Sequence, residues 1–183
     1  MPQLAPFVAK RMRSSDDEAL SPKYAHLERE RRWLVCPVKS ALLETTDPIT
    51  ITDHYIIGTR LRLRRMECEG LTPSFKLTRK YDCADPLARP IVTAYLTDAE
   101  FDVFASLPSH VIQKRRFLVR EDGHDFSLDR FDGALAGLEL AEIEMADDTG
   151  LRKLPDPPWA VCDVSNDIRY QGGTLVVNGI PRE

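Results

Sequence analysis

The residues of this chain that are best suited to chemistry are charged side chains repeated at every second position of short segments. Carboxylates repeat in this way in residues 28–30 and 142–144, and arginines do so in residues 60–64. Alternate side chains of an extended strand share one face, so each segment would carry its charges on one side and apolar residues on the other. We therefore expect strands that are sharply two-faced.

Two further basic segments show the same alternation. Lys76, Thr78 and Lys80 alternate with Phe75 and Leu77, Lys114 and Arg116 are set against Phe117 and Val119, and an isolated acid, Asp129, lies between Leu128 and Phe131. An ordinary sheet with one face in water explains any one of these strands. The strands taken together fit a water-exposed sheet less well, because like charges in register are costly unless a counter-ion offsets them. A barrel with its charged faces inward is the better interpretation.

Such a lumen would suit a metal ion and a polyanion. Carboxylates are hard-oxygen ligands for Mg²⁺ or Mn²⁺, and the predicted metal ligands are Glu28, Glu30, Asp129, Glu142 and Glu144. Arginine and lysine bind phosphate oxygens, and cations outnumber carboxylates in the inward set. In an empty lumen we expect these cations to repel one another.

Bulk composition excludes several classes of protein. The formal net charge is −4, which argues against nucleic acid or an anionic membrane as partner. The four cysteines lack metal-binding spacing and predict reduced, mostly buried thiols in a cytoplasmic protein. No apolar stretch is long enough for a signal peptide or a membrane span. We expect one domain over 24–183, preceded by an extension over 1–23.

Local signals predict short elements around this domain. Turn-forming clusters separate the alternating segments, as in antiparallel hairpins. Thr97 and Glu100 have capping-box spacing ahead of an apolar stripe, which predicts a helix near 97–107. A second short helix is predicted over about 37–44. The four histidines share no ligand spacing, and Trp33 and Trp159 are interpreted as packing residues.

Several motifs, taken in order, resemble those of the CYTH superfamily, the triphosphate tunnel metalloenzymes. The motifs are Glu28-x-Glu30-x-Arg32, which is similar to E-x-E-x-K, then Arg62-Leu63-Arg64, Leu77-Thr78-Arg79-Lys80, Lys114-Arg115-Arg116-Phe117, Asp129-Arg130-Phe131-Asp132-Gly133, Glu142-Ile143-Glu144 and the closing segment from Asp163 to Tyr170. Each motif is weak by itself. Their order and spacing carry the resemblance, which runs from residue 28 to about residue 175.

The resemblance implies a mainly β (α+β) fold, an eight-stranded antiparallel closed β-barrel with helices packed outside. It implies metal-dependent hydrolysis of a small-molecule triphosphate, most simply inorganic tripolyphosphate to pyrophosphate and phosphate. The residues assigned to catalysis are Glu28, Glu30, Arg32, Glu142 and Glu144, and those assigned to substrate are Arg62, Arg64, Lys76, Lys80, Lys114 and Arg116.

Two departures from the family pattern keep alternatives open. Arg32 replaces the family lysine, and a guanidinium cannot release a proton at accessible pH. Ile91 and Thr93 stand where relatives often have acids after an arginine such as Arg89. Thiamine triphosphatase, adenylate cyclase and a non-catalytic polyphosphate or nucleotide sensor remain alternatives, whereas a nucleic-acid module at residues 60–65 is disfavoured by net charge. The oligomeric state, a homodimer included, stays open.

Overall fold

The alternating segments form the strands of one antiparallel sheet, in a computed structural model that describes residues 23–37 and 47–182. The strands are β1 (His26–Val35), β2 (Ile49–Ile56), β3 (Leu61–Glu67), β4 (Ser74–Lys80), β5 (Ala88–Leu96), β6 (Ser109–Glu121), β7 (His124–Phe131), β8 (Glu139–Glu144) and β9 (Ala160–Asp163). The helices are α2 (Asp98–Ala105), α3 (Asp148–Lys153) and α4 (Gly172–Asn178), with 3₁₀ turns η1 (Gly133–Leu135) and η2 (Ile168–Tyr170).

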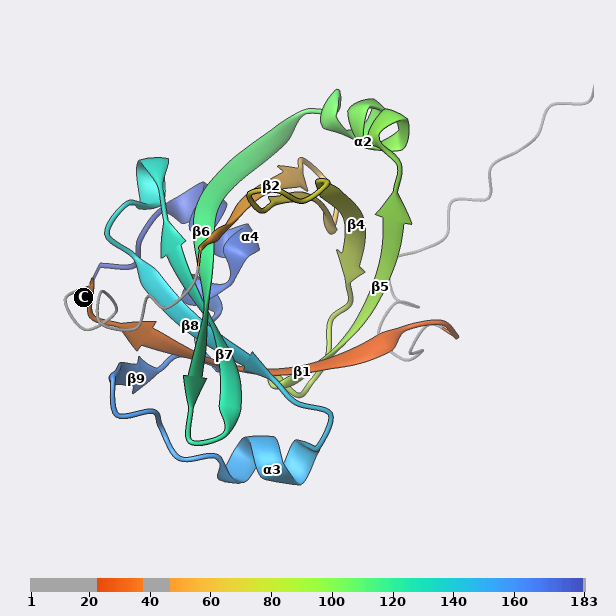
Figure 1. Cartoon of the computed structure of the whole chain (residues 1–183). Helices are drawn as coiled ribbons and strands as arrows, with labels where there is room; N and C mark the ends of the chain where they lie inside the picture. Colours follow the sequence, from red (N-terminus) through yellow and green to blue (C-terminus); the bar gives the residue numbers. More distant parts are fainter. Residues whose placement is uncertain (1–22, 38–46, 183) are drawn as a thin grey trace, which may run out of the picture.

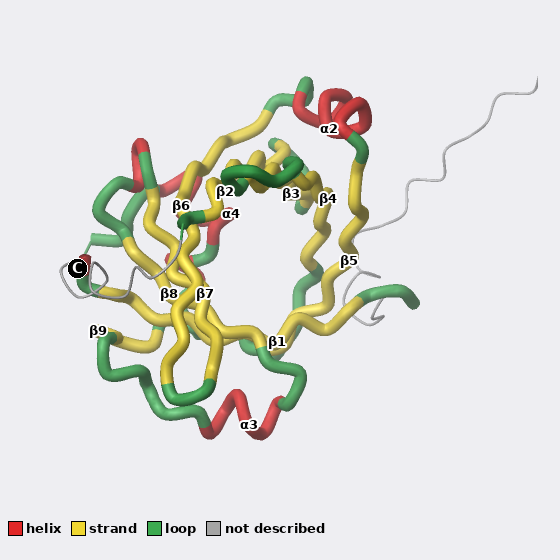
Figure 2. The backbone as a smooth tube through the Cα atoms, in the orientation of Figure 1, coloured by secondary structure: helices red, strands yellow, loops and turns green. Residues whose placement is uncertain are grey.

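The sheet closes on itself through its first strand. The strand order is β5-β4-β3-β2-β6-β7-β8-β1-β9, and an additional β1–β5 pairing closes the ring (Figures 1 and 2). In this closure Glu28 lies opposite Arg89, while Glu30 lies opposite Glu144 of β8. The predicted eight-stranded closed barrel is confirmed. β9 is an addition that alternation did not reveal, since four residues are too few for a pattern.

The apolar face of β1 packs on the outside of the barrel. Trp33 is completely buried there and makes an edge-to-face contact with Phe126, which in turn contacts Trp159. Leu151 of α3 joins the same cluster from outside. Removing an aromatic side chain from such a cluster costs about 3–5 kcal/mol. Because these rings occupy the outer face, the alternate charged positions of β1 point inward.

Helix α2 covers the outside of β3 and β4, at the top of Figure 1. Its capping box is present as predicted, with Thr97 accepting from the backbone N–H of Glu100 and the Glu100 side chain accepting from that of Thr97. Phe101 is the buried residue of the helix and packs on Leu63 and Phe75. The predicted helix near 97–107 is confirmed, ending at Ala105.

Helix α4 lies against inward-facing residues of the barrel. Leu175 packs on Ile112 of β6 and Leu140 of β8, within an apolar cluster that also receives Tyr55. Only glycine fits at position 172, because a Cβ atom there would lie 1.9 Å from Tyr55 Oη. The absence of a side chain at Gly172 therefore lets the start of α4 approach β2 and occupy part of the barrel interior.

Three sequence-based expectations have different outcomes. The 1–23 extension and the 37–44 helix lie outside the described residues, apart from Lys23 and Pro37. The four cysteines are free, but the expectation that most are buried is wrong: two are half-buried and two exposed, because Cys83 follows β4 in a loop and Cys162 lies on short β9. Among the described residues, no helix is long and apolar enough to span a bilayer.

Candidate functional site

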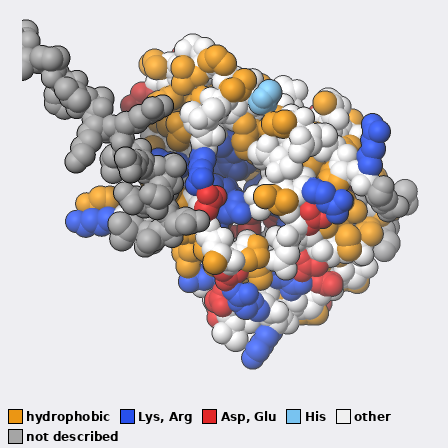
Figure 3. Space-filling view, turned by 180° about the vertical axis from the view of Figure 1, so that it is seen from behind, with side chains coloured by type: hydrophobic (Ala, Val, Ile, Leu, Met, Phe, Trp, Pro, Cys, Tyr) orange, Lys and Arg blue, Asp and Glu red, His pale blue; other side chains and the backbone are white. Residues whose placement is uncertain are grey.

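The inward faces of the strands enclose a cavity of about 390 Å³ that is lined by charges of both signs. Its volume lies in the range of small-ligand pockets. Its cationic side chains are Arg32, Arg60, Arg62, Arg64, Lys80, Arg89, Lys114 and Arg116, and its carboxylates are Glu28, Glu30, Asp53, Asp82, Glu142 and Glu144. Figure 3 shows basic side chains gathered in a hollow of one face.

The structure brings most of the predicted site residues together but not all of them. Every residue predicted for catalysis lines the cavity, as do the predicted substrate residues other than Lys76. Lys76 is drawn away by Tyr95, whose ring lies 5.1 Å from the ammonium. Asp129 is fully buried and does not line the cavity. Sequence alternation therefore found the faces, whereas the contacts of individual side chains decide which of them reach the cavity.

The inner side of β6, β7 and β8 carries a saturated ion network, which we call the β6–β8 wall (Lys114, Arg116, Asp129, Glu142). Asp129 accepts from Lys114 Nζ at 2.5 Å and from Arg116 Nε and Nη2 at 2.6 and 2.7 Å. Arg116 also donates to Glu142 at 2.9 Å. Burial lowers the pKa of Lys114, and the charge of Asp129 opposes this only in part. This geometry fits Asp129 as the residue that positions two cations, while its role as a metal ligand stays a prediction.

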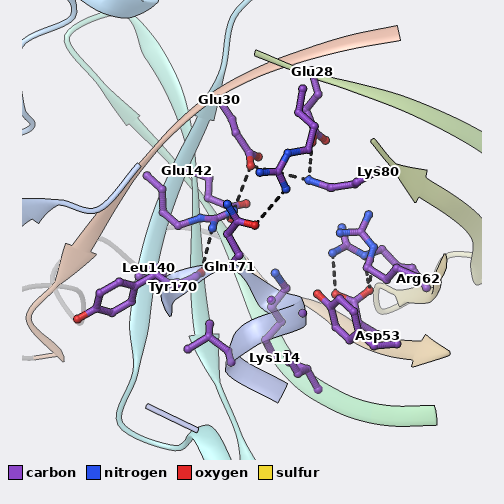
Figure 4. A pocket seen from close by; sticks show the side chains of 18 of the residues that line it. Glu28, Glu30, Asp53, Arg62, Lys80, Lys114, Leu140, Glu142, Tyr170 and Gln171 are labelled. Atoms are coloured by element: carbon purple, nitrogen blue, oxygen red, sulfur yellow. Dashed lines mark hydrogen bonds and ion pairs between the residues drawn. The ribbon is translucent and has the colours of Figure 1, made fainter. Parts of the chain in front are cut away.

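Arg32 links the acidic strands to the C-terminal segment. Its guanidinium donates to Glu142 at 2.8 Å, to Glu30 at 3.2 Å and to the carbonyl oxygen of Tyr170 at 2.9 Å (Figure 4). Burial alone would lower the pKa of Arg32, but the two carboxylates outweigh it and raise the pKa above its ordinary value. Arg32 therefore stays charged and cannot act as a base.

Asp53 of β2 is a site residue that sequence reasoning missed. It is 1% exposed and accepts from Arg64 Nε at 2.6 Å and Nη2 at 2.7 Å. Burial alone would raise its pKa, but Arg64 and Arg62 outweigh that effect and hold the pKa below the usual range of an aspartate. A signal was present in the sequence, because Asp53 shares its strand face with Ile51 and Tyr55, and aspartate is depleted in strands.

Apart from Arg64, the cations on the inner side of β3, β4 and β5 are less saturated, and we call Arg60, which precedes β3, together with Arg62, Lys80 and Arg89 the β3–β5 wall. Lys80 donates to Glu28 at 2.5 Å, and Arg89 donates to the side-chain oxygen of Gln171 at 3.1 Å. Arg60 pairs with Asp82, and both side chains are exposed. Arg62 makes no hydrogen bond to any residue in the described part of the chain, and its buried Nε has only a longer ion pair with Asp53, at 3.7 Å. This wall keeps donor capacity for an anion.

The carboxylates of β1 and β8 have the chemistry for a divalent cation. Glu28, Glu30, Glu142 and Glu144 offer hard oxygen donors on neighbouring strands, the set that Mg²⁺ or Mn²⁺ prefers. Their present partners are cations, and Glu144 contacts His26 at 3.4 Å. Within residues 23–37 and 47–182, no three acidic, histidine or cysteine side chains converge on a common point. The donor chemistry suits such an ion, and the assignment of these carboxylates as its ligands stays a prediction.

The expectation that the cations repel one another in the empty lumen is wrong for the buried ones. Arg64 is neutralised by Asp53, while Lys114 and Arg116 share Asp129. The inward-facing residues predicted from the sequence did not include Asp53. The other ion pairs depend on the register between strands that are far apart in the sequence. The buried cations are thus stabilised by built-in counter-ions.

Other residues singled out from the sequence have structural roles. His54 points outward, where its Nδ1 forms a hydrogen bond of 3.2 Å with the hydroxyl of Ser109 and its ring packs on Phe101. Trp33 and Trp159 belong to the outer apolar cluster, as predicted. Arg169 forms an exposed ion pair with Asp167 and does not line the cavity.

Comparison with known proteins gives one partial sequence relative and several solved structures of similar fold. No family model matches the chain. An inorganic triphosphatase of Acetivibrio thermocellus is 38% identical over 68 residues, which make up 37% of this chain and 42% of that protein. The match thus spans less than half the length of the relative. A crystal structure of an inorganic triphosphatase superposes with a TM-score of 0.54 at 21% identity, covering 84% of this chain and 97% of that one.

A second solved structure has the same barrel. A proposed adenylate cyclase from Bacillus halodurans superposes with a TM-score of 0.53 at 16% identity, over 70% of this chain and 85% of that chain. Both structures share the closed barrel of this chain, as expected from the resemblance of its motifs to the CYTH superfamily. At these identities the solved structures show the fold alone, and a shared fold does not by itself choose among the activities of the proteins that have it.

Proposed function

We propose that this chain is a divalent-metal-dependent triphosphatase that hydrolyses inorganic tripolyphosphate to pyrophosphate and phosphate. The observation that carries the proposal is one cavity that opposes the carboxylates of β1 and β8 to the cations of β3 and β4. The sequence relative named inorganic triphosphatase supports the same reaction class. A water oxygen would bond to the terminal phosphorus, the bridging P–O bond would break, and pyrophosphate would leave with that electron pair.

The chain's own residues would hold the reactants. Arg62 and Lys80 would bind non-bridging phosphate oxygens and offset the charge that builds up on the leaving group. Glu28, Glu30, Glu142 and Glu144 would hold Mg²⁺ or Mn²⁺, which when bound supplies charge neutralisation and a water of lowered pKa. Arg32 would keep Glu30 and Glu142 oriented, a role that its three hydrogen bonds support and that does not require proton transfer.

A phosphate-release screen tests this reaction. Purified protein is assayed with tripolyphosphate, thiamine triphosphate, ATP and pyrophosphate, each with Mg²⁺ or Mn²⁺. We expect the fastest release from tripolyphosphate, and loss of activity with excess EDTA. Full activity in EDTA would remove the metal from the proposal. Preferred cleavage of thiamine triphosphate, or conversion of ATP to cyclic AMP, would replace the proposed substrate by one of the superfamily alternatives.

Thermal stability provides a test of binding apart from turnover. Tripolyphosphate at a hundred times its dissociation constant should stabilise the fold by about 2.7 kcal/mol, a rise of roughly 5–10 °C in Tm. Chloride at matched ionic strength should produce no such rise. An unchanged Tm at millimolar tripolyphosphate, with and without metal, would contradict the proposed ligand.

A non-catalytic sensor is the second candidate. It is favoured by the engagement of Glu28, Glu30 and Glu142 with cations instead of with one another. A sensor would bind tripolyphosphate and raise Tm without releasing phosphate under any metal. The two assays together therefore separate the candidates.

The setting that we propose is cytoplasmic, with a small-molecule triphosphate as partner. The four cysteines without disulfides and the net charge of −4 support a reducing compartment and a partner other than nucleic acid or membrane. Binding of the protein to immobilised nucleic acid, at physiological salt and without tripolyphosphate, would contradict this part of the proposal.

A further inference from the structure

The two inward arginines of β3 differ in their surroundings although they occupy equivalent positions of one strand. The Arg64 side chain is 10% exposed and is held by both oxygens of Asp53. The Arg62 side chain is 19% exposed, its Nε lies 3.7 Å from Asp53 Oδ1, and it forms no hydrogen bond within the described residues. One carboxylate thus satisfies one arginine and leaves its neighbour open.

The strand register explains this asymmetry. Asp53 lies directly opposite Arg64 in the β2–β3 pairing, whereas the residue opposite Arg62 is Tyr55. A paired side chain directly across two antiparallel strands can form a bidentate contact without strain. Arg62 lies one pleat further along, too far for a hydrogen bond to Asp53 but within the cavity (Figure 4).

We propose that Asp53 is a specificity-determining positioning residue, an internal counter-ion that occupies Nε and Nη2 of Arg64 and leaves Arg62 as the main arginine of β3 for the phosphate chain. The inference rests on the proposed function, because it assumes a polyphosphate in the cavity. Arg64 uses Nε and Nη2 for Asp53 and keeps Nη1 for a phosphate oxygen, because a bidentate contact to phosphate would require it to give up the buried carboxylate. Arg62 has no such cost.

Binding and stability should respond in opposite directions when Asp53 is changed. Asp53→Asn removes the counter-charge, so Arg64 becomes free to pair with an anion. We expect the Tm of the empty protein to fall while the affinity for tripolyphosphate, measured by calorimetry, rises at least threefold. A merely structural role for Asp53 would lower both together. Weaker or unchanged tripolyphosphate binding by a folded Asp53→Asn protein would overturn the proposal.

The two arginines supply the matched comparison. Arg62→Met should weaken tripolyphosphate binding at least tenfold with little change in Tm. Arg64→Met should lower Tm by about 6–20 °C because it strands Asp53, and should leave binding within threefold of the wild type. If Arg64→Met does not fold, Arg64→Lys and Arg62→Lys replace the pair with the same expectations. Equal losses of binding from both positions would also overturn the proposal.

A double variant separates this inference from the proposed function. Asp53→Asn combined with Arg64→Met removes both charges and should recover at least half of the Tm lost in Arg64→Met. If the wild type binds no tripolyphosphate, the proposed function fails, and the counter-ion assignment is then decided by this cycle alone. Additive losses of Tm would show that Asp53 and Arg64 do not depend on each other.

Discussion

The β6–β8 wall and the β3–β5 wall carry similar side chains but use their charges differently. On the first, Asp129 and Glu142 engage every cationic group, and Lys114 and Arg116 are 8% and 16% exposed. On the second, Lys80 and Arg60 are 27% and 47% exposed and Arg62 lacks a hydrogen bond within the described residues. The first wall is an internally paired ion network, and the second has donors that the proposed function assigns to the substrate.

This difference indicates that counting charges in a lumen overestimates its capacity for an anion. A buried cation without a partner would be very costly, so burial and pairing occur together. The cations that remain for a ligand are those at intermediate exposure, where water offsets part of the cost. The same residue types therefore stabilise the fold on one side of the cavity and, under the proposed function, would bind substrate on the other.

The largest expected effect comes from breaking the saturated wall. Asp129→Asn would leave Lys114 and Arg116 buried with only Glu142 as counter-charge, and we expect a loss of about 3–5 kcal/mol in the free energy of unfolding. Chemical denaturation of the variant and the wild type measures it. Asp125→Asn on the same β6–β7 hairpin is the control, since its pair with Arg120 is exposed and should leave stability unchanged. Equal stability of Asp129→Asn and wild type would mean that the wall is not an ion network in solution.

Carboxylates next to the two walls should differ in how they affect turnover and stability. Glu28→Gln and Glu144→Gln should each reduce tripolyphosphate turnover at least tenfold while Tm stays close to that of the wild type. Glu142→Gln should reduce both turnover and Tm, because Glu142 also neutralises Arg32 and Arg116. Steady-state kinetics and thermal melts of the same preparations measure the two effects.

The control for these carboxylates is Glu69→Gln, which changes an exposed side chain in the loop after β3. It should behave as the wild type in both assays. Near-normal turnover in Glu28→Gln and Glu144→Gln would show that the acidic face does not take part in the reaction. A Tm loss in Glu28→Gln as large as that in Glu142→Gln would remove the distinction between the two walls.

The smallest expected effect concerns acid. The pKa values of Asp53, Asp129 and Glu142 are all held below their ordinary values, in spite of burial, by neighbouring cations. A lowered folded-state pKa stabilises the fold above the unfolded-state pKa of about 4, and this stability is lost as pH falls further. Each group adds at most about 1.4 kcal/mol per pH unit to the slope below that pH.

Asp53→Asn should therefore reduce the slope of the unfolding free energy against pH, by the equivalent of one bound proton. The free energy of unfolding is measured between pH 4.5 and pH 2.5. Asp125→Asn serves again as the control, because its exposed pair should leave the slope as in the wild type. A slope in Asp53→Asn identical to that of the wild type would show that Asp53 does not stay ionised in the folded protein.

Alternation predicted the faces of the barrel strands, and the family motifs predicted the eight-stranded closure. Both succeed because an inward position such as Glu30 and an outward one such as Trp33 are set by local geometry. The capping box of α2 is likewise a local interaction between residues three apart. These features depend on short stretches of sequence, which a single chain displays directly.

The pairing of charges could not be predicted in the same way. Arg32 meets Glu142 and Tyr170 across 110 and 138 positions of sequence, so their contacts depend on barrel register and on the path of the C-terminal segment. Asp53 was missed because its strand has a mixed pattern of threonines, isoleucines and a histidine instead of a run of like charge. Lys76 shows the reverse error, since its parity is correct but a neighbouring tyrosine draws it out of the cavity.

The pairing of β1 with both β5 and β8 has a consequence for the order of events during folding. Strands β2 to β5 pair with their neighbours in the chain, as do strands β6 to β8, and β6 also pairs with β2. In contrast, Glu30 of β1 pairs with Glu144 of β8 across more than a hundred residues. Contacts between distant residues form slowly, because the entropy of closing a long loop is lost before the contact stabilises the chain. Ring closure by β1 is therefore expected among the last steps. Because β1 carries Glu28, Glu30 and Arg32, a chain that has formed every hairpin would still lack part of the proposed metal site, so recovery of phosphate release from tripolyphosphate should lag behind recovery of β-structure in refolding.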